Sequence, residues 1–444
     1  MAPSLGIGLI VQYLAQYYAK LKNYPPVFRN FKGHWNLELI TLYKIYGPVY
    51  TIWIGPWPFV IICDLDLAKE AFAKVDFSGR PSSELGETFG NAEIAFSNYG
   101  KMWETLRKVG HSAMRKYAKS DELPDCVNNN VGELVSVLKD SVGVDKPFNP
   151  KDYLLELFMN MQLSIASSQQ CKINKDQMDK FKYCFDGFQS DLGNWLFLYE
   201  FVPILRYFMA NPLTKYKQYF NTIKDVLKDI YEKHAKTYDK ENTNNFCDLL
   251  ITAKHEAETQ AKGSAQYLTD DNLTATIMDV IMPGSDLNHQ FQWILLFVAY
   301  YPEVQRKLRQ EIANELDDRP VITEDKHQLT CYIDNHASIP AGTSVVVQQY
   351  SILLDDKYWD KPDEFNPGRF LDNEGKQVVV KPAAFIPFGV GRRQCIGEQL
   401  ATNSLFLTLL TTDYNIAISN PTNETLDADP INLWLQFPKQ YNVL

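Results

Sequence analysis

The sequence has few cysteines and no close pair of them. Its 444 residues include seven, at positions 63, 126, 171, 184, 247, 331 and 395. An odd number of widely spaced thiols excludes a disulfide framework and a zinc site built on C-x-x-C pairs. We therefore expect reduced thiols, as in a protein that faces the cytosol.

Excess positive charge is also missing. The formal net charge of −10 argues against a general nucleic-acid binder, so no nucleic-acid partner is expected. There is no low-complexity segment and no repeat of fixed period. With 45% hydrophobic and 13% aromatic residues, the chain should fold throughout, as two lobes or one large helical domain.

No hydrophobic run is long enough to span a membrane with certainty. The apolar stretch from Leu5 to Tyr18 contains Gln12 and Gln16 and is shorter than the roughly 20 residues that a spanning helix needs. It lacks a basic leader and a cleavage site. We predict a short membrane-associated segment over residues 1–22, followed by one domain over 23–444. An amphipathic helix packed on the protein's own surface fits the segment equally well.

Secondary-structure patterns favour a mostly α protein with small β-sheets over a doubly wound fold. Residues 49–64 combine two β-branched and aromatic runs around a Gly-Pro-Trp-Pro turn, which predicts a hairpin. Apolar residues at helical spacing predict a helix over 214–240 and a helix pair over 181–212. A polar loop is expected around Gly263.

The stretch FIPFGVGRRQCIGEQLA, residues 385–401, places Cys395 directly before a helical pattern. A helix start stabilises a thiolate, which soft and redox metals prefer. The glycines at 389, 391 and 397 would let a flat group approach the backbone, and Arg393 could neutralise its negative charge. One cysteine alone suits haem better than zinc, because the porphyrin already supplies four ligands. A buried structural cysteine is the alternative.

This loop resembles the cytochrome P450 haem-thiolate enzymes. The family's signature F-x-x-G-x-R-x-C-x-G is reproduced at Phe388, Gly391, Arg393, Cys395 and Gly397. The resemblance implies a cytochrome P450-like fold and haem b (iron protoporphyrin IX) as the cofactor. It also implies that Cys395 is the axial iron ligand and that the other four positions form the cofactor-binding loop.

Three further segments resemble parts of the same family. Trp103 and Arg107 match W-x-x-x-R, whose side chains donate to a haem propionate in the family. The stretches at 339–343 and 365–370 match I-P-x-G-T and F-x-P-x-R-F. The N-terminal half is similar to the animal microsomal branch that includes steroid 17-hydroxylases. That likeness implies a lipophilic substrate and a place on the cytosolic face of the endoplasmic reticulum membrane.

The helix around Trp103 is basic within an acidic protein. Besides Arg107, this stretch carries Glu104 against five cations, Lys101, Lys108, Arg115, Lys116 and Lys119. The resemblance implies a docking surface for the acidic flavin domain of NADPH-cytochrome P450 reductase. A solvated face without a partner is equally consistent with the charge run.

The distal helix departs from the family pattern. The family's A-G-x-D-T-T appears as residues 283–288, with Gly284 and Asp286 kept as candidate catalytic residues. Leu287 replaces the alcohol that passes a proton in the family, and a leucine cannot donate one. Ser285 or Asn288 could place a water there, although each lies on another side of the helix. Pro283 should kink or unwind the helix locally.

A second departure is an absence. Between about residue 315 and I-P-A-G-T, the family's K helix with E-x-x-R is not found, and Glu303 to Arg306 belongs to the preceding helix. In the family that motif pairs with the arginine matched by Arg369, and an unpaired buried charge costs several kcal/mol. Either Arg369 turns to solvent, or the chain is a splice form or faulty gene product that folds badly.

Three functions remain open at this point. The first is a membrane-attached monooxygenase that takes electrons from NADPH through a reductase and inserts oxygen into a lipophilic substrate such as a steroid. The second is a haem-thiolate isomerase or dehydratase that needs no reductase, with which Leu287 is compatible. The third is an inactive haem-binding form. Reductase-dependent turnover, hydroperoxide turnover without reductase, and absence of haem would separate them.

Overall fold

The computed structural model describes most of the chain, namely residues 27–28, 35–54, 57–81, 83–88, 94–143, 146–167, 175–191, 194–241, 243, 245–316, 343–371, 381–415, 419 and 441–443. It divides into two compact units. The first comprises Met1–Ser83, Gly193–Pro212 and His327–Cys395, and the second comprises Glu84–Leu192, Leu213–Lys326 and Ile396–Leu444. The predicted segment 1–22 and the region of the missing E-x-x-R motif lie outside the described residues.

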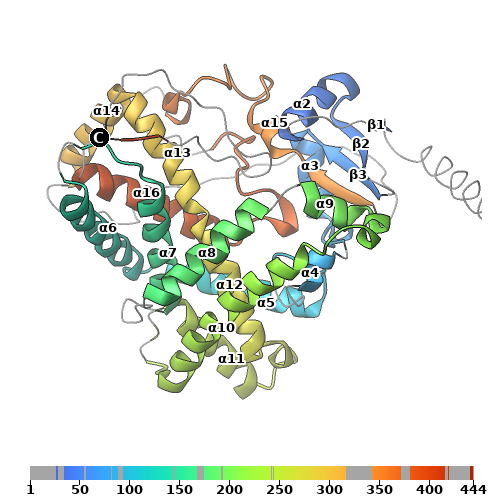
Figure 1. Cartoon of the computed structure of the whole chain (residues 1–444), viewed down its shortest axis with the longest axis horizontal. Coiled ribbons are helices and arrows are strands. Elements are labelled where there is room, and N and C mark those ends of the chain that lie inside the picture. The colour runs from blue at the N-terminus through green and yellow to red at the C-terminus, as the bar shows by residue number, and fades with distance from the viewer. Residues whose placement is uncertain are drawn as a thin grey trace, which may run out of the picture. The chain divides into compact units, whose positions relative to one another are not determined.

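The first unit is built on a four-stranded sheet in the order β1-β2-β3-β4 (Figure 1). The predicted hairpin is confirmed: β2 (Val49–Ile54) and β3 (Trp57–Ile62) pair antiparallel, with Val49 opposite Ile62. The edge strands β1 (Val27–Phe28) and β4 (Ser344–Val347) run parallel to their neighbours. β4 falls in the stretch that resembles the I-P-x-G-T strand, about 280 residues after β3 in the sequence.

Short helices surround this sheet within the first unit. They are α2 (Trp35–Tyr46), α3 (Leu65–Ala73), η1 (Val75–Phe77), α9 (Asn194–Phe201), η2 (Pro203–Tyr207), α15 (Gln349–Leu353), η5 (Pro367–Phe370) and η6 (Gly391–Arg393). Asp64 caps α3 by accepting the backbone N–H groups of Asp66 and Leu67. Val60 and Ile62 share a buried apolar cluster with Leu65 and residues from the 352–386 region. This packing fixes α3 against the sheet.

The second unit is helical. It contains α4 (Glu84–Thr88), α5 (Lys101–Tyr117), α6 (Glu122–Ser141), α7 (Lys151–Ser167), α8 (Lys175–Asp191), α10 (Leu213–Thr237), α11 (Phe246–Thr259), η3 (Ala265–Tyr267), α12 (Asp270–Ser285), α13 (Leu287–Tyr300), α14 (Pro302–Leu316) and α16 (Glu398–Asn415). α7 is buried on most sides and packs against α12, α13 and α6. The prediction of a mostly α protein with a small sheet is confirmed.

Individual helix predictions also hold. The helix pair appears as α8 and α9, the helix over 214–240 as α10, and Gly263 lies in the turn between α11 and η3. α10 buries Tyr216, Phe220, Ile223, Leu227 and Ile230, at the three- and four-residue steps that predicted it. Within the described part of the chain, no helix combines the length and apolarity needed to cross a bilayer.

The distal helix is interrupted close to its proline. Pro283 lies inside α12, which ends at Ser285, and α13 begins at Leu287. Asp286 joins the two helices, and its backbone N–H donates to the Pro283 carbonyl over 3.1 Å. The break therefore falls three residues after the proline, whereas the N–H bond that Pro283 lacks belongs to the turn before it.

Candidate active site

The loop before Cys395 is held in a conformation that requires glycine. Gly389 and Gly391 have φ of 79° and 78°, in the left-handed region. A methyl group on Gly391 would collide with the Phe72 carbonyl and lie 2.6 Å from the Phe72 Cβ atom, whereas one on Gly389 would meet only Gln349, at 3.8 Å. The loop at Gly391 thus lies directly against the end of α3.

Cys395 differs from the other described cysteines in its exposure. Cys63, Cys126, Cys184 and Cys247 are buried, while Cys395 is exposed; positions 171 and 331 lie outside the described residues. Burial raises the pKa of Cys63 to about 11 and that of Cys126 to about 12, so these thiols stay protonated. The interpretation of Cys395 as a buried structural cysteine is wrong.

Hydrogen bonds fix the backbone on both sides of the thiol. The Cys395 N–H donates to the Phe388 carbonyl over 2.9 Å, which closes the loop between the first and eighth residues of the signature. The Arg393 Nε atom donates to the Ser78 carbonyl over 2.8 Å. Gly397 accepts the Ala401 N–H in the first turn of α16, which begins at Glu398. The thiol thus stands just before a helix, as predicted.

The predicted propionate donors lie on α5 in the second unit. Trp103 is buried, and its indole N–H donates to the Ile94 carbonyl over 3.1 Å. The Arg107 guanidinium lies 5.3 Å from the centre of the Trp103 ring, in cation–π geometry. The two side chains are therefore neighbours, as their four-residue spacing implies. Their role toward a propionate stays a prediction.

On the distal helix, Gly284 provides room for another side chain. A methyl group there would lie 2.9 Å from the Gln162 Cγ atom and would collide with the amide of the same side chain, which comes from α7 and is 1% exposed. Gln162 had no signal in the sequence, because its partner is about 120 residues away.

The polar neighbours of Leu287 are already bonded. The Ser285 hydroxyl donates to the Ile281 carbonyl. The Asn288 Nδ2 atom donates to the Ser285 carbonyl, and its Oδ1 atom accepts a hydrogen bond from Nε2 of Gln292. Both side chains are 1% exposed, and Leu287 itself is buried in the apolar core. Such engagement disfavours Ser285 and Asn288 as replacements for the missing alcohol.

Asp286 is the accessible acid of this segment. Its side chain is 46% exposed, and its Oδ1 atom lies 3.7 Å from Nδ1 of His289. The His289 ring is nearly buried and stacks on Phe185 of α8, with 6.2 Å between centroids and an interplanar angle of 7°. His289 was missed in the sequence, although a histidine among apolar residues of a helix offered a signal.

Comparison with known proteins places this geometry in a family. The sequence profile described as Cytochrome P450 matches residues 26–336 and 327–412, which together make up most of the chain. The chain belongs to the cytochrome P450 family. The match comes in two parts that meet where the sequence departs from the family pattern around E-x-x-R.

Individual relatives agree with this membership. Cytochrome P450 2U1 of Rattus norvegicus is 28% identical over 411 residues, covering 84% of this chain and 75% of that protein. Steroid 17-alpha-hydroxylase/17,20 lyase of Gallus gallus is 27% identical over 408 residues, covering 84% and 80%. A zebra fish cytochrome P450 solved with progesterone superposes with a TM-score of 0.77 at 22% identity, covering 92% of this chain and 98% of that one. The fold is that of the cytochromes P450.

Members of the cytochrome P450 family bind haem b, and the residues of this chain fit that cofactor. Among the residues that the structure describes, no three His, Cys, Asp or Glu side chains are grouped to hold a metal ion. A single exposed thiol in a glycine-lined loop suits a metal that brings its own equatorial ligands. The chain is accordingly a cytochrome P450 oxidoreductase of the monooxygenase type.

Arg369 of this cytochrome P450 donates to backbone carbonyls, and not to the E-x-x-R carboxylate that the family implies. Its Nη2 atom donates to the Lys361 carbonyl over 2.7 Å and to the Glu364 carbonyl over 2.6 Å, and Nη1 donates to the Asp360 carbonyl. The side chain is partly exposed. Arg369 therefore does not simply turn to solvent: its guanidinium binds backbone carbonyls of the 360–364 turn. The alternative of a splice form or faulty gene product stays untested.

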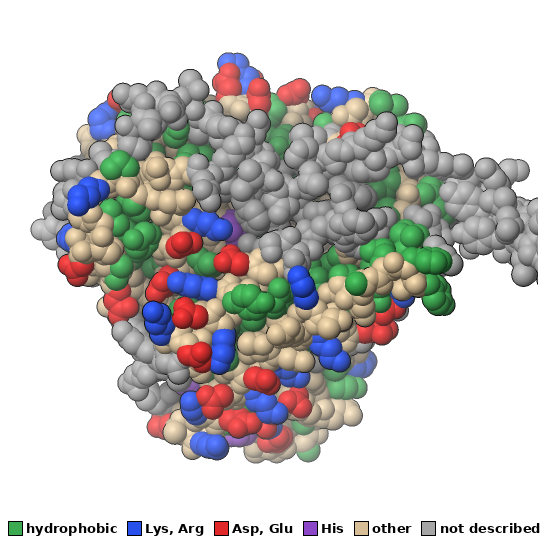
Figure 2. Space-filling view, in the orientation of Figure 1, with side chains coloured by type: hydrophobic (Ala, Val, Ile, Leu, Met, Phe, Trp, Pro, Cys, Tyr) green, Lys and Arg blue, Asp and Glu red, His purple; other side chains and the backbone are tan. Residues whose placement is uncertain are grey.

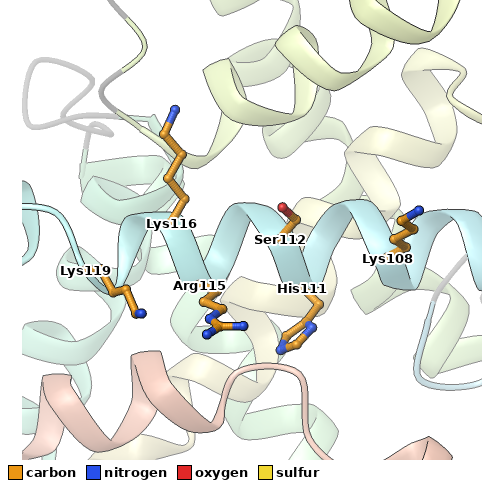
Figure 3. A pocket seen from close by; sticks show the side chains of 6 residues that line it. All are labelled: Lys108, His111, Ser112, Arg115, Lys116 and Lys119. Atoms are coloured by element: carbon orange, nitrogen blue, oxygen red, sulfur yellow. The ribbon is translucent and has the colours of Figure 1, made fainter.

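The basic face of α5 surrounds a surface pocket of about 400 Å³ (Figure 3). It is lined by Lys108, His111, Ser112, Arg115, Lys116 and Lys119. Lys101 pairs with Glu104 over 3.4 Å, whereas no ion pair within the described part of the chain involves Lys108, Arg115 and Lys116 of this helix or Lys119 just after it. We call these four residues, Lys108, Arg115, Lys116 and Lys119, the basic face.

Proposed function

We propose that this cytochrome P450 is a membrane-associated monooxygenase of the endoplasmic reticulum that oxidises a lipophilic, steroid-like substrate with electrons from NADPH-cytochrome P450 reductase. The exposed Cys395 thiol carries the proposal, because it is the accessible soft ligand in a loop shaped by Gly389 and Gly391. In this proposal Cys395 is the axial ligand. Arg393 and Arg107 are the proposed propionate donors, and Trp103, whose indole N–H donates to the Ile94 carbonyl, supports the Arg107 guanidinium through their cation–π contact.

Haem held by a thiolate supplies oxygen activation, since the sulfur donates electron density that favours O–O cleavage. The residues of the chain supply proton handling. Asp286, with its accessible carboxylate near His289, is the proposed group that holds and passes a proton in this segment. Gly284, beside it, allows the Gln162 side chain to approach the helix backbone. Leu287 excludes water from the start of α13.

The spectrum of the reduced, carbon monoxide-bound protein tests the axial ligand. We expect Cys395→Ser to abolish the absorption band of the thiolate complex, because an alcohol is not a thiolate donor. Gln394→Ser, a change in the adjacent residue of the same loop, is the matched control and should keep the band. An unchanged band in the Cys395 variant would contradict the proposal.

The basic face supports a reductase as the electron donor. Its exposed charges, which have no ion-pair partner among the described residues, suit an acidic partner surface, and such contacts weaken as salt rises. We expect Arg115→Glu with Lys116→Glu to lower reductase affinity at least about tenfold at low salt. Lys262→Glu changes the charge of an exposed lysine elsewhere and is the control. Equal affinities for the two variants would indicate a solvated face.

An exposed aromatic pair supports a membrane surface and a lipophilic substrate. Tyr207 and Phe208, which follow α9, are 85% and 81% exposed, and Figure 2 shows hydrophobic side chains gathered on this part of the first unit. Aromatic side chains favour the interface between lipid and water. Progesterone, present in the zebra fish structure, is the first substrate probe. Reductase-dependent oxidation of it would support the steroid-like assignment.

A second function is favoured by the distal segment. Leu287 is apolar and buried, and the nearby Ser285 and Asn288 are engaged in hydrogen bonds. An isomerase or dehydratase that rearranges a hydroperoxide needs no reductase and no alcohol at this position. Turnover of fatty-acid hydroperoxides in the absence of reductase, with no NADPH-dependent oxidation of steroids, would establish this second function instead.

A further inference from the structure

Asn288 stands at the junction between α12 and α13. Ser285 is the last residue of α12, and its carbonyl accepts a hydrogen bond from Nδ2 of Asn288 over 2.7 Å. In an uninterrupted α-helix that carbonyl would accept the backbone N–H four residues later, which is that of His289. The His289 N–H donates to the Asp286 carbonyl over 3.0 Å. The side-chain amide thus bonds a carbonyl at a helix end, where such groups lack partners within the helix.

The Asn288 amide is itself held from its other side. Its Oδ1 atom accepts a hydrogen bond from Nε2 of Gln292 over 2.7 Å, one turn further along α13. Asn288 and Gln292 are 1% and 5% exposed and alternate along α13 with the core residues Leu287 and Phe291. A buried amide is costly unless its donor and acceptor are both bonded, and here both are. The two hydrogen bonds therefore fix the amide in one orientation.

The hydrogen bond from Asn288 to Ser285 closes a turn that contains Asp286. Nδ2 of Asn288 also lies 3.5 Å from Nδ1 of His289, and the Asp286 Oδ1 atom lies 3.7 Å from the same ring nitrogen. The His289 ring stacks on Phe185 of α8. Asn288 therefore contacts both the backbone that precedes Asp286 and the imidazole that lies beside the Asp286 carboxylate.

We propose that Asn288 is a positioning residue: by bonding the Ser285 carbonyl it holds the junction closed and keeps the Asp286 carboxylate beside the His289 ring. This positioning follows from the contacts of the junction alone. Its consequence for turnover rests on the proposed function, in which Asp286 passes a proton. The family pattern A-G-x-D-T-T has a threonine where this chain has Asn288, so the role belongs to a residue by which the chain departs from that pattern.

Hydrogen exchange in the haem-loaded, carbon monoxide-bound protein tests the proposal. Asn288→Leu removes the amide donor. We expect the backbone N–H groups of Asp286 and His289 then to exchange about 10- to 100-fold faster, relative to those of α10, as for the loss of a buried hydrogen bond. Asn288→Thr should restore most of the protection, because a threonine hydroxyl can bond the carbonyl three residues earlier.

Asn130→Leu is the matched control. Asn130 of α6 is also buried, and its Nδ2 atom donates to the Cys126 carbonyl over 2.7 Å. This variant loses the same kind of hydrogen bond outside the distal segment, so exchange at Asp286 and His289 should stay within about twofold of the parent. Equal acceleration in the Asn130 and Asn288 variants would overturn the positioning role.

Turnover of progesterone with reductase provides a second readout. Asn288→Leu should lower kcat about 10- to 100-fold and leave KM nearly unchanged, because a displaced proton donor slows the reaction without weakening substrate binding. Asn130→Leu should keep kcat. Faster exchange with unchanged kcat would support the positioning role and contradict the proton role of Asp286. If the parent shows no reductase-dependent turnover, the proposed function fails, and the exchange measurement still decides the positioning role.

Gln292→Met covers the case in which Asn288→Leu does not fold. It leaves the Asn288 donor in place but removes the hydrogen bond that fixes its amide. Exchange at Asp286 and His289 should therefore rise about 3- to 10-fold. Exchange as slow as in the parent would overturn the proposal.

Discussion

Replacing Gly391 by alanine should damage the cysteine loop more than the same change at Gly389. Both residues have φ close to 80°, so both substitutions carry the cost of an L-residue in the left-handed region. They differ in their surroundings. The new methyl group collides with the Phe72 carbonyl only in Gly391→Ala, whereas in Gly389→Ala the Gln349 amide is an ordinary 3.8 Å away.

The expected magnitudes follow from these two terms. A left-handed alanine costs about 1–2 kcal/mol relative to glycine, and this is the whole effect expected at Gly389. At Gly391 the backbone of α3 must also move, and such overpacking adds about 1–3 kcal/mol. The Gly391 variant should therefore unfold with a free energy lower by about 2–5 kcal/mol, against about 1–2 kcal/mol for the control.

Denaturant unfolding and the reduced carbon monoxide spectrum measure both effects. We expect Gly389→Ala to retain most of the haem, since a glycine-to-alanine change without a collision leaves the loop able to close. Gly391→Ala should lose much of the cofactor, because displacement from Phe72 also displaces the peptide that leads to Cys395. Equal losses of stability in the two variants would refute the role assigned to the contact with Phe72.

Three further predictions concern charged groups. Arg369→Ala should lower stability by about 1 kcal/mol or more, since three carbonyls lose a charged donor, and Arg369→Lys should restore only part of it in denaturant titrations. Arg309→Met should lower the free energy of unfolding by about 3 kcal/mol, because Arg309 is the charged partner of the Asp413 carboxyl, whose pKa burial raises and Arg309 lowers. Arg306→Met, at an exposed arginine, is the control. A smaller loss of stability in the Arg309 variant than in this control would contradict the reasoning. As pH rises from about 4 to about 7, the parent protein should lose stability relative to Asp279→Asn by up to about 1.4 kcal/mol per pH unit, because burial raises the pKa of this carboxyl of α12 to about 7, and a raised carboxyl pKa stabilises the fold only while the proton is bound. A stability difference that does not change with pH would show that Asp279 does not titrate in this range.

Local patterns determined what the sequence could predict. The hairpin over 49–64 and the helix α10 follow from alternation and helical spacing, which need no knowledge of distant residues. The place of Cys395 just before a helix also follows from the local pattern, and α16 begins at Glu398. These features depend on neighbours within one or two turns of the chain.

Long-range partners could not be predicted in the same way. The Trp103 indole donates to the Ile94 carbonyl, Gln162 packs against Gly284, and Arg369 binds the 360–364 turn. Each of these contacts depends on how helices, strands and loops pack together, and residue spacing along the chain does not determine it. Arg369 is instructive, because the E-x-x-R partner implied by the family is not found in this sequence. A guanidinium has five N–H donors in a planar fork, so a turn rich in carbonyls can replace a carboxylate.

The helix break after Pro283 connects the two departures of the distal helix from the family pattern, the proline at position 283 and the leucine at position 287. A proline and an apolar residue at the alcohol position look like two separate losses in the sequence. In the structure α12 ends at Ser285 and α13 starts anew at Leu287, so the two helices need not share one register. Leu287 can then join the core while Asp286, at the junction, keeps an accessible carboxylate beside His289. The proposed proton handling in this segment therefore uses an acid beside an imidazole, where the family has an acid and an alcohol.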